Sequence, residues 1–202
     1  MAELPGRSRD VGESDLPAAG EEGRLSKRDF EDLKRTRRHP RPTQSDYLHI
    51  RYLVRDLERA IGKADGRPVR DVLDVFCGTR PYEDLLPPGA RCVGLDYPDN
   101  PYGVADVVTN EFLPFADESF DLVLCLEAFH YVTDPHHGVA ELRRVLRPGG
   151  TVIVAVPLVW EYDRTIVEHR YTGPALSALF EGWQQVEVVE NGGMAVSWAT
   201  LT

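Results

Sequence analysis

Val69–Leu86 reads VRDVLDVFCGTRPYEDLL, and this stretch decides the fold. The run Val72–Val75 is rich in branched apolar residues, which is typical of a strand, and Asp74 lies near its end. The small-residue turn Cys77–Thr79 comes next, and Pro81 is suited to the first position of a helix. A strand, a glycine-containing turn and a helix begin a doubly wound α/β sheet, in which backbone N–H groups at the helix start face a ligand.

A second strand is predicted at Arg91–Tyr97, with Asp96 near its end. A carboxylate about 20 residues beyond the glycine turn can accept hydrogen bonds from two ribose hydroxyls, and Tyr97 can stack on an adenine ring. The same carboxylate can instead form a turn ahead of Pro98. The spacing favours a nucleoside or dinucleotide cofactor. A nicotinamide-dependent dehydrogenase fits less well because the chain has no G-x-G-x-x-G run.

Two further stretches narrow the choice: Leu113–Leu126 reads LPFADESFDLVLCL, and Val145–Pro157 reads VLRPGGTVIVAVP. Together with the glycine turn, they resemble in order and spacing the D-x-G-C-G, L-P-F-x-D-x-x-F-D and L-R-P-G-G motifs of class I S-adenosylmethionine-dependent methyltransferases. The resemblance covers about Val69–Glu190. It implies a Rossmann-like α/β fold with a doubly wound, mostly parallel sheet, whose last strand is short or missing here.

The same resemblance implies methyl transfer from S-adenosylmethionine to an oxygen, nitrogen or carbon of a small-molecule acceptor, with S-adenosylhomocysteine as product. Asp74 is expected to hold the turn and the methionine amino group, and Gly78 lets the backbone approach the ligand. The usual first and last glycines are replaced by Phe76 and Arg80. Arg80 followed by Pro81-Tyr82 resembles a subgroup in which a basic residue and a Pro-Tyr pair replace the glycine. Cofactor contacts are thereby expected at Asp74, Phe76, Cys77, Gly78, Arg80, Tyr82, Asp96, Tyr97, Thr109, Asn110 and Glu127.

In the family, an acid four residues before L-P-F accepts a hydrogen bond from the adenine amino group. Here that position is Thr109, followed by Asn110, and either side chain offers a neutral oxygen acceptor. Phe76 and Thr109 also motivate an alternative function. The chain can be a non-catalytic methyltransferase-like module that has lost or repurposed its cofactor site and binds a partner through its N-terminal helix.

The catalytic candidates follow the fourth predicted strand, Phe120–Leu126, at the end where the transferred methyl group should face the acceptor. His130 has an ordinary pKa near ~6.5 and suits a general base at neutral pH, but a structural hydrogen bond explains it equally well. Tyr131 can orient the acceptor or simply pack. The aromatic and charged groups of Trp160–Tyr171 lie where acceptor specificity is expected, and a polar surface loop is the alternative. The Asp and His residues form no recognisable metal-ligand set.

The remaining elements are read from periodicity and from turn residues. The helix Tyr47–Ile61 is predicted to begin with Asp46 as its cap, to end at Gly62 and to bury a stripe made of Leu48, Tyr52, Leu53, Leu57 and Ile61. The other predicted elements are a capped helix Ser26–Arg38, a third strand Val104–Val108, a helix Pro135–Leu146, a tight turn Arg147–Gly150, a fifth strand Thr151–Val156, a helix Thr172–Phe180 and a strand Gln185–Val189. The last strand of the sheet is either missing or supplied as an edge strand by Ala195–Leu201.

These elements divide the chain into a disordered N-terminus (1–23), a basic helical segment with a linker (24–45) and a methyltransferase domain (46–202). The basic segment has three possible roles: a solvated helix, a lid over the cofactor, or a docking patch for an acidic partner.

Composition limits the function further. The chain has 202 residues, 42% hydrophobic and 28% charged, which suits one soluble domain with a modest appendage. A net charge of −10 argues against a general nucleic-acid binder. No apolar run is long enough for a membrane span, and no signal-peptide core is visible. Cys77, Cys92 and Cys125 are expected to be free thiols in a reducing cytoplasm. The sequence leaves the acceptor and the oligomeric state open.

Overall fold

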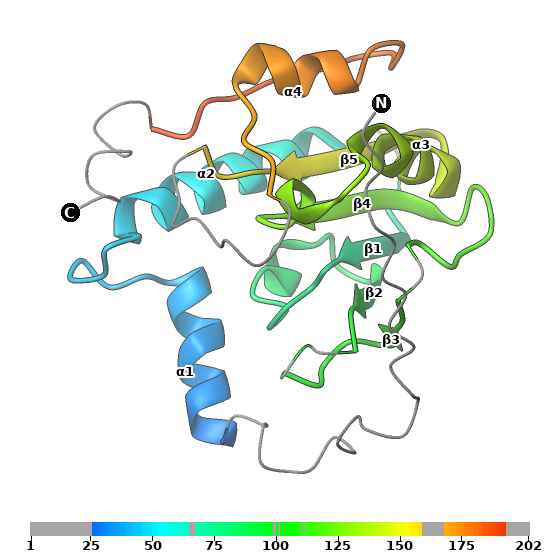
Figure 1. The fold of residues 1–202 in the computed structure, drawn as a ribbon. Coiled ribbons are helices and arrows are strands. Elements are labelled where there is room, and N and C mark those ends of the chain that lie inside the picture. The colour runs from blue at the N-terminus through cyan, green and yellow to red at the C-terminus, as the bar shows by residue number, and fades with distance from the viewer. Residues whose placement is uncertain are drawn as a thin grey trace, which may run out of the picture.

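The computed structural model describes residues 26–64, 68–98, 100, 102–110, 112–158 and 168–192. Five parallel strands form one sheet in the order β3-β2-β1-β4-β5 (Figure 1). The strands are β1 (Asp71–Val75), β2 (Arg91–Asp96), β3 (Val107–Val108), β4 (Phe120–Leu126) and β5 (Leu146–Ala155). The order reverses between β1 and β4, which is the switch point where such sheets bind ligands outside the carboxyl ends of the strands. The predicted fold class is confirmed.

Helices cover both faces of the sheet (Figure 1). On one face, α2 (Tyr47–Lys63) packs Leu57 and Ile61 against buried side chains of the central strands, Val72, Leu122 and Leu124. On the other face, α3 (Pro135–Val145) and α4 (Gly173–Leu179) cover the larger core. Because successive strand residues point to opposite faces, both faces of β1 and β4 are apolar, as expected for a buried parallel sheet.

The predicted capping of α1 (Lys27–Arg38) is present, because the Ser26 hydroxyl accepts a hydrogen bond from the Asp29 backbone N–H at 3.2 Å. In α2, Asp46 precedes the helix but makes no side-chain capping bond, and the helix continues beyond Gly62. Leu48 is 37% exposed, whereas Ile50 is buried. The predicted stripe was therefore wrong at its first residue, because the helix is rotated toward Ile50.

Two predicted strands and one predicted helix are shorter or absent. The third strand is limited to Val107–Val108, since the Asp106 carboxylate accepts from the Gly94 N–H at 2.8 Å and ends the ladder there. The helix expected from Pro81 is only a 3-10 turn, η3 (Glu83–Leu85), because Pro87 holds Leu86 in extended conformation.

Gln185–Val189 is not a strand, since it pairs with none of the described strands, and Val186, Val188 and Val189 are exposed. By contrast β5 is longer than expected. The segment Arg147–Gly150 forms its irregular first half, with a register shift opposite Phe120–Leu122, and is not a separate tight turn.

Several predictions lie outside the described residues: the disordered N-terminus, the edge strand Ala195–Leu201 and the first part of the acceptor loop, Trp160–Arg164. Within the described part of the chain, no helix has the length and apolar character needed to cross a membrane. The same part holds no cluster of side chains suited to a metal ion.

Candidate functional site

The turn after β1 places three alternate residues in the left-handed region of backbone conformation. The φ angles are 58° at Phe76, 55° at Gly78 and 53° at Arg80. Glycine adopts this region freely, whereas a side chain makes it costly by about 1–2 kcal/mol. Phe76 and Arg80 therefore hold a backbone conformation that glycine would adopt at lower cost.

The Asp96 carboxylate, at the carboxyl end of β2, is buried and holds this turn. Its Oδ2 accepts a hydrogen bond from the Gly78 N–H at 2.9 Å and one from the side-chain amide of Asn100. Its Oδ1 accepts from the Tyr97 N–H at 2.9 Å, and the Cys77 thiol lies 4.0 Å from Oδ2. A carboxylate has about four acceptor positions, so these bonds leave capacity for a ribose hydroxyl. The structural role of Asp96 is thus present, and its ribose contact stays a prediction.

The Phe76 ring joins an aromatic row. Its centroid lies 5.0 Å from that of Tyr97 and 6.0 Å from that of Phe112, and it packs against the core under α3. The Phe76 ring therefore packs on the face of the sheet that α3 covers. Tyr97 is 42% exposed, so much of its ring is free to stack on a ligand.

Asp74 occupies a position in which a negative charge is unfavourable. Burial raises the pKa of its carboxyl to about 7; the charge of Arg80 opposes this effect, while those of Asp96 and Glu83 add to it. No donor among the described residues forms a hydrogen bond with its side chain. A cation placed beside Asp74 would restore the ionised form.

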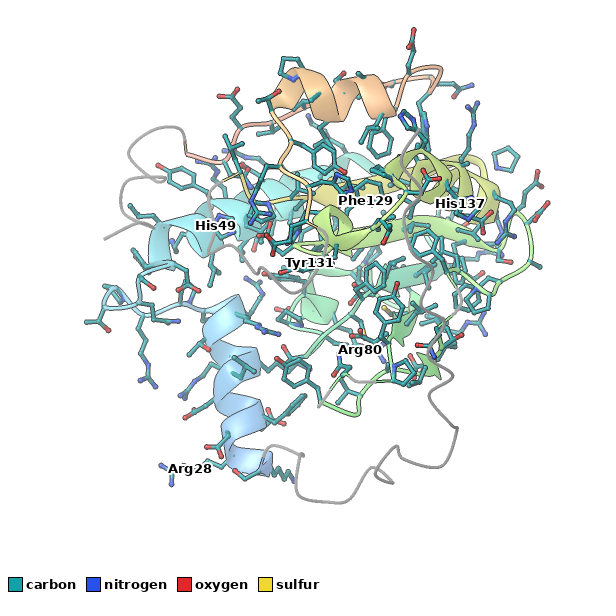
Figure 2. The ribbon with its side chains drawn as sticks, in the orientation of Figure 1. Arg28, His49, Arg80, Phe129, Tyr131 and His137 are labelled. Carbon is teal, nitrogen blue, oxygen red and sulfur yellow. The ribbon has the colours of Figure 1, made fainter. Side chains whose placement is uncertain are left out.

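Glu127 follows β4, the strand beside β1, so it lies at the same edge of the sheet as Asp74. Its Oε2 lies 3.0 Å from Nε2 of His49 on α2, while Oε1 is buried and has no hydrogen-bond partner in the described part of the chain. Burial lowers the pKa of His49, but the bond to Glu127 and its charge raise that pKa by more. Burial raises the pKa of the Tyr82 phenol, and the charge of Glu127 adds to this effect. In Figure 2, His49 projects from α2 toward the residues after β4.

His130 lies in η4 (Phe129–Tyr131), immediately after this acid, and is 2% exposed. Neither ring nitrogen has a hydrogen-bond partner among the residues that the structure describes. Burial lowers the pKa of His130, the Glu127 and Glu168 carboxylates raise it, and the Arg170 guanidinium lowers it. The net shift is downward, so the imidazole is neutral at pH 7 and can accept a proton. The exposed Tyr131 ring lies 3.8 Å from the His130 ring, centroid to centroid.

The structure directs Arg80 toward β2 and β3 (Figure 2). Its guanidinium donates to the Cys92 carbonyl at 3.0 Å, to Asp106 at 2.8 Å and to Glu83 at 3.1 Å. These bonds fasten the turn to the neighbouring strand. The cofactor contact of Arg80 stays a prediction.

The basic helix α1 reaches the glycine turn. An added Cβ on Gly78 would lie 3.3 Å from Nη1 of Arg37, whose Nη2 donates to the Tyr102 hydroxyl at 3.2 Å. Arg38 forms ion pairs with Asp84 at 3.1 Å and with Glu58 at 3.4 Å. The helix thus lies beside the turn, and its function as a lid or as a docking patch stays a prediction.

Three other predicted contacts surround Asp96 and the turn. The Thr109 N–H donates to the Asp96 carbonyl at 3.1 Å, and the exposed Asn110 follows. The Cys77 N–H donates to the Leu95 carbonyl at 3.0 Å, and burial raises the pKa of the Cys77 thiol. Cys77 is therefore a packed, protonated residue of the turn.

Two residues were missed from the sequence. His49 lies in the predicted helix Tyr47–Ile61. A histidine beside the apolar stripe of an amphipathic helix is a signal that could have indicated a site residue. Arg144 donates to the carbonyls of Leu113 and Phe115 at 2.9 and 2.7 Å and so fixes the L-P-F motif. No local sequence signal links Arg144 to a loop 30 residues earlier.

The larger cavity among the described residues, about 1470 Å³, lies elsewhere. It runs along the side of β5 that no described strand pairs with, between α2 and α4, and Val154, Leu176 and Trp183 are among its lining residues. Asp74, Gly78 and Asp96 do not line this cavity.

Comparisons with known proteins agree with this geometry. A family model described as a methyltransferase domain matches residues 73–154. A demethylmenaquinone methyltransferase of Renibacterium salmoninarum is 36% identical over 104 residues, which is 44% of this chain and 41% of that protein. A malonyl-[acyl-carrier protein] O-methyltransferase of Hahella chejuensis is 32% identical over 126 residues, 52% of this chain and 45% of that protein. The chain thus spans less than half the length of these relatives.

Among solved structures, an S-adenosylmethionine-dependent methyltransferase of Aquifex aeolicus superposes with a TM-score of 0.54 at 17% sequence identity. The superposition covers 84% of this chain and 94% of the other. At this identity the likeness concerns the fold.

The cofactor of the family is S-adenosylmethionine, which carries an ammonium and a sulfonium cation, and the residues present fit it. Asp74 lacks a described donor, and Glu127 has a buried oxygen without a partner, at the ends of adjacent strands. Both carboxylates would gain from a cation between the two strand ends. Residues 73–154 of this chain therefore match a methyltransferase domain, and the chain shares the fold of a solved S-adenosylmethionine-dependent methyltransferase.

Proposed function

We propose that the protein transfers a methyl group from S-adenosylmethionine to a small-molecule acceptor that reaches the site without a negative charge. The observation that carries the proposal is the pair of acids, Asp74 and Glu127, whose carboxylates are incompletely satisfied at the carboxyl ends of β1 and β4. An acid pair at this position favours a cationic donor over a neutral or anionic ligand.

When bound, the cofactor would supply an electrophilic methyl group, with the sulfur keeping the electron pair of the bond that breaks. Asp74 and Glu127 would bind and orient its cations, and Asp96 would accept a hydrogen bond from its ribose. His130 takes the proton of the acceptor hydroxyl while the oxygen lone pair forms the new bond to carbon. Alignment of donor and acceptor supplies most of the rate, up to about 7–11 kcal/mol in favourable cases, and the base adds about 10²–10⁴ in rate.

The charge around His130 selects the acceptor class. Glu127 and Glu168 are partly or fully buried, and the charges of both act on the His130 imidazole. Arg170 pairs with Glu168, so Glu127 is the acid whose like charge an acceptor carboxylate would meet. The names of two relatives give contrasting acceptors: demethylmenaquinone is uncharged, whereas a malonyl group carries a free carboxylate. We infer that the acceptor of this chain is closer in charge to the first.

The proposal is tested by calorimetric titration with S-adenosylhomocysteine. We expect saturable binding to the wild type and at least tenfold weaker binding to Asp74→Asn, because that variant loses the anionic partner of the ligand ammonium. Asp71→Asn is the matched control, since Asp71 lies at the opposite end of the same strand, where it pairs with Arg91 and Arg147. Absence of heat at millimolar ligand would leave the non-catalytic module as the better description.

A further inference from the structure

One cation of α1 faces the glycine turn without an acidic partner. Arg35 is exposed and forms an ion pair with Asp32 on the same helix. Arg38 forms ion pairs with acids of α2 and η3. Arg37 is half-buried between them in the sequence, and none of the acids that the structure describes forms an ion pair with it. Burial of a charge is unfavourable without a counter-charge, so this guanidinium calls for an anionic partner.

The guanidinium of Arg37 is held by the segment that follows β2. Its Nη2 donates to the Tyr102 hydroxyl at 3.2 Å, and its Cζ lies 5.3 Å from the centroid of the same ring. The Tyr102 N–H donates to the side-chain oxygen of Asn100 at 2.8 Å, and the Asn100 amide donates to the Asp96 carboxylate. The ring of Phe30, two turns earlier on α1, lies 6.4 Å from the Tyr102 ring, centroid to centroid. Arg37 is therefore linked through two residues to the acid that is predicted to hold the ribose.

The other terminal nitrogen of this guanidinium faces the turn after β1. Nη1 of Arg37 lies 3.3 Å from the position that a Cβ would occupy on Gly78. Gly78 comes four residues after Asp74, a buried acid with no hydrogen-bond donor among the described residues. The turn thus has an acid on its strand side and a cation on its helix side, and the two do not pair with each other. An α-amino acid group carries an ammonium and a carboxylate on one carbon and offers a partner to each.

We propose that Arg37 binds the carboxylate at the methionine end of the cofactor, a role that rests on the proposed methyl transfer. Asp74 would take the ammonium group from the strand side, and Arg37 would take the carboxylate from the helix side. The planar fork of arginine matches the two oxygens of a carboxylate, whereas lysine presents a point charge. Arg37 lies outside residues 73–154, so this contact would come from a part of the chain that the methyltransferase-domain match does not include. The site would thereby distinguish the intact cofactor from a nucleoside thioether that lacks the carboxylate.

The test compares two ligands by calorimetric titration and needs no acceptor. The first is S-adenosylhomocysteine, and the second is its decarboxylated analogue, which keeps the adenosine, the sulfur and the ammonium. Arg37→Gln is expected to weaken the binding of S-adenosylhomocysteine by about tenfold or more, because a charged hydrogen-bond partner is lost. Binding of the analogue is expected to stay unchanged or to tighten, because the analogue offers Arg37 only a positive charge. Retained binding of the analogue also verifies that the variant is folded.

Arg35→Gln is the matched control, an exposed position on the same helix that is expected to leave both affinities unchanged. Arg37→Lys keeps the charge but loses the fork, so its affinity for S-adenosylhomocysteine should fall between those of the wild type and Arg37→Gln. Equal weakening of both ligands by Arg37→Gln, or weakening of neither, would overturn the role of Arg37 and leave the methyl transfer standing. Failure of the wild type to bind either ligand would reject the cofactor itself, and this role with it.

Discussion

At the scale of single residues, the turn after β1 has a left-handed backbone at three positions, although residues other than glycine occupy two of them. Phe76, Gly78 and Arg80 share a left-handed φ, although only one of them is glycine. Each replacement has a compensation in the structure. The Phe76 ring packs with Tyr97 and Phe112, and the Arg80 guanidinium binds the neighbouring strand.

This interpretation predicts an unusual order of stability at Phe76. Phe76→Gly loses the ring but relaxes the backbone, whereas Phe76→Ala loses the ring and keeps the strained φ of 58°. We expect the glycine variant to exceed the alanine variant in free energy of unfolding by about 1 kcal/mol. Urea denaturation measures both. An alanine variant equal to or more stable than the glycine variant would contradict the left-handed conformation.

At the scale of elements, the side chain of Arg144 joins the L-P-F loop to α3. Arg144 donates to two loop carbonyls and to the carboxylates of Asp117 and Glu141. The planar fork of arginine serves these acceptors together, whereas lysine presents a single point charge. The loop leads into β4 and so positions Glu127 and His130.

Arg144→Lys is accordingly expected to lower the free energy of unfolding by about 1–3 kcal/mol, since at least one loop carbonyl loses its donor. Arg143→Lys is the matched control at the adjacent, exposed position, where the guanidinium lies 5.8 Å from the Trp183 ring centroid. Urea denaturation of the pair gives the difference. Equal stability of the two variants would show that the fork is dispensable.

The elements also show how far sequence reasoning reaches. The strands β1, β2 and β4 and the helices α1 and α3 were predicted nearly to the residue, because periodicity, caps and prolines are local signals. The helix expected at Pro81 and the strand at Gln185–Val189 were wrong, since their formation depends on neighbours in space. Leu48 was wrong for the same reason, because packing on the sheet decides how α2 is rotated.

The site divides in the same way. Asp74, Asp96 and His130 were predicted at or just after strand ends, and the structure has them there, because a linear pattern records such positions. The pairing of His49 with Glu127 and the approach of Arg37 to Gly78 were not foreseen, because they join segments far apart in the chain. Contacts of this kind depend on the tertiary fold and leave no spacing in the sequence.

At the scale of the whole molecule, the chain carries a net charge of −10 and still buries acids at one edge of its sheet. The helix α1 brings positive charge to that edge, where Arg38 joins α2 and η3 through Glu58 and Asp84. Asp74 nonetheless has a pKa of about 7, well above the ordinary 3.8. The folded protein therefore retains a proton that the unfolded chain releases between these two pH values.

It follows that this group stabilises the protein at low pH and loses its contribution as the pH rises through about 7. Asp74→Asn cannot ionise, so its advantage in free energy of unfolding over the wild type should grow by about 1 kcal/mol between pH 6 and pH 8. Above pH 8 the advantage should level off, which provides an internal control. Urea denaturation across this range measures it, and an advantage that stays constant between pH 6 and pH 8 would show that Asp74 is ionised throughout.

The left-handed conformation shared by Phe76, Gly78 and Arg80 has a consequence for recognising such sites. A sequence-motif search looks for three glycines and misses a chain that has phenylalanine and arginine at two of these positions. A search for positive φ angles at alternate residues directly after a strand would find this chain. It would also find other chains in which different residues replace the glycines.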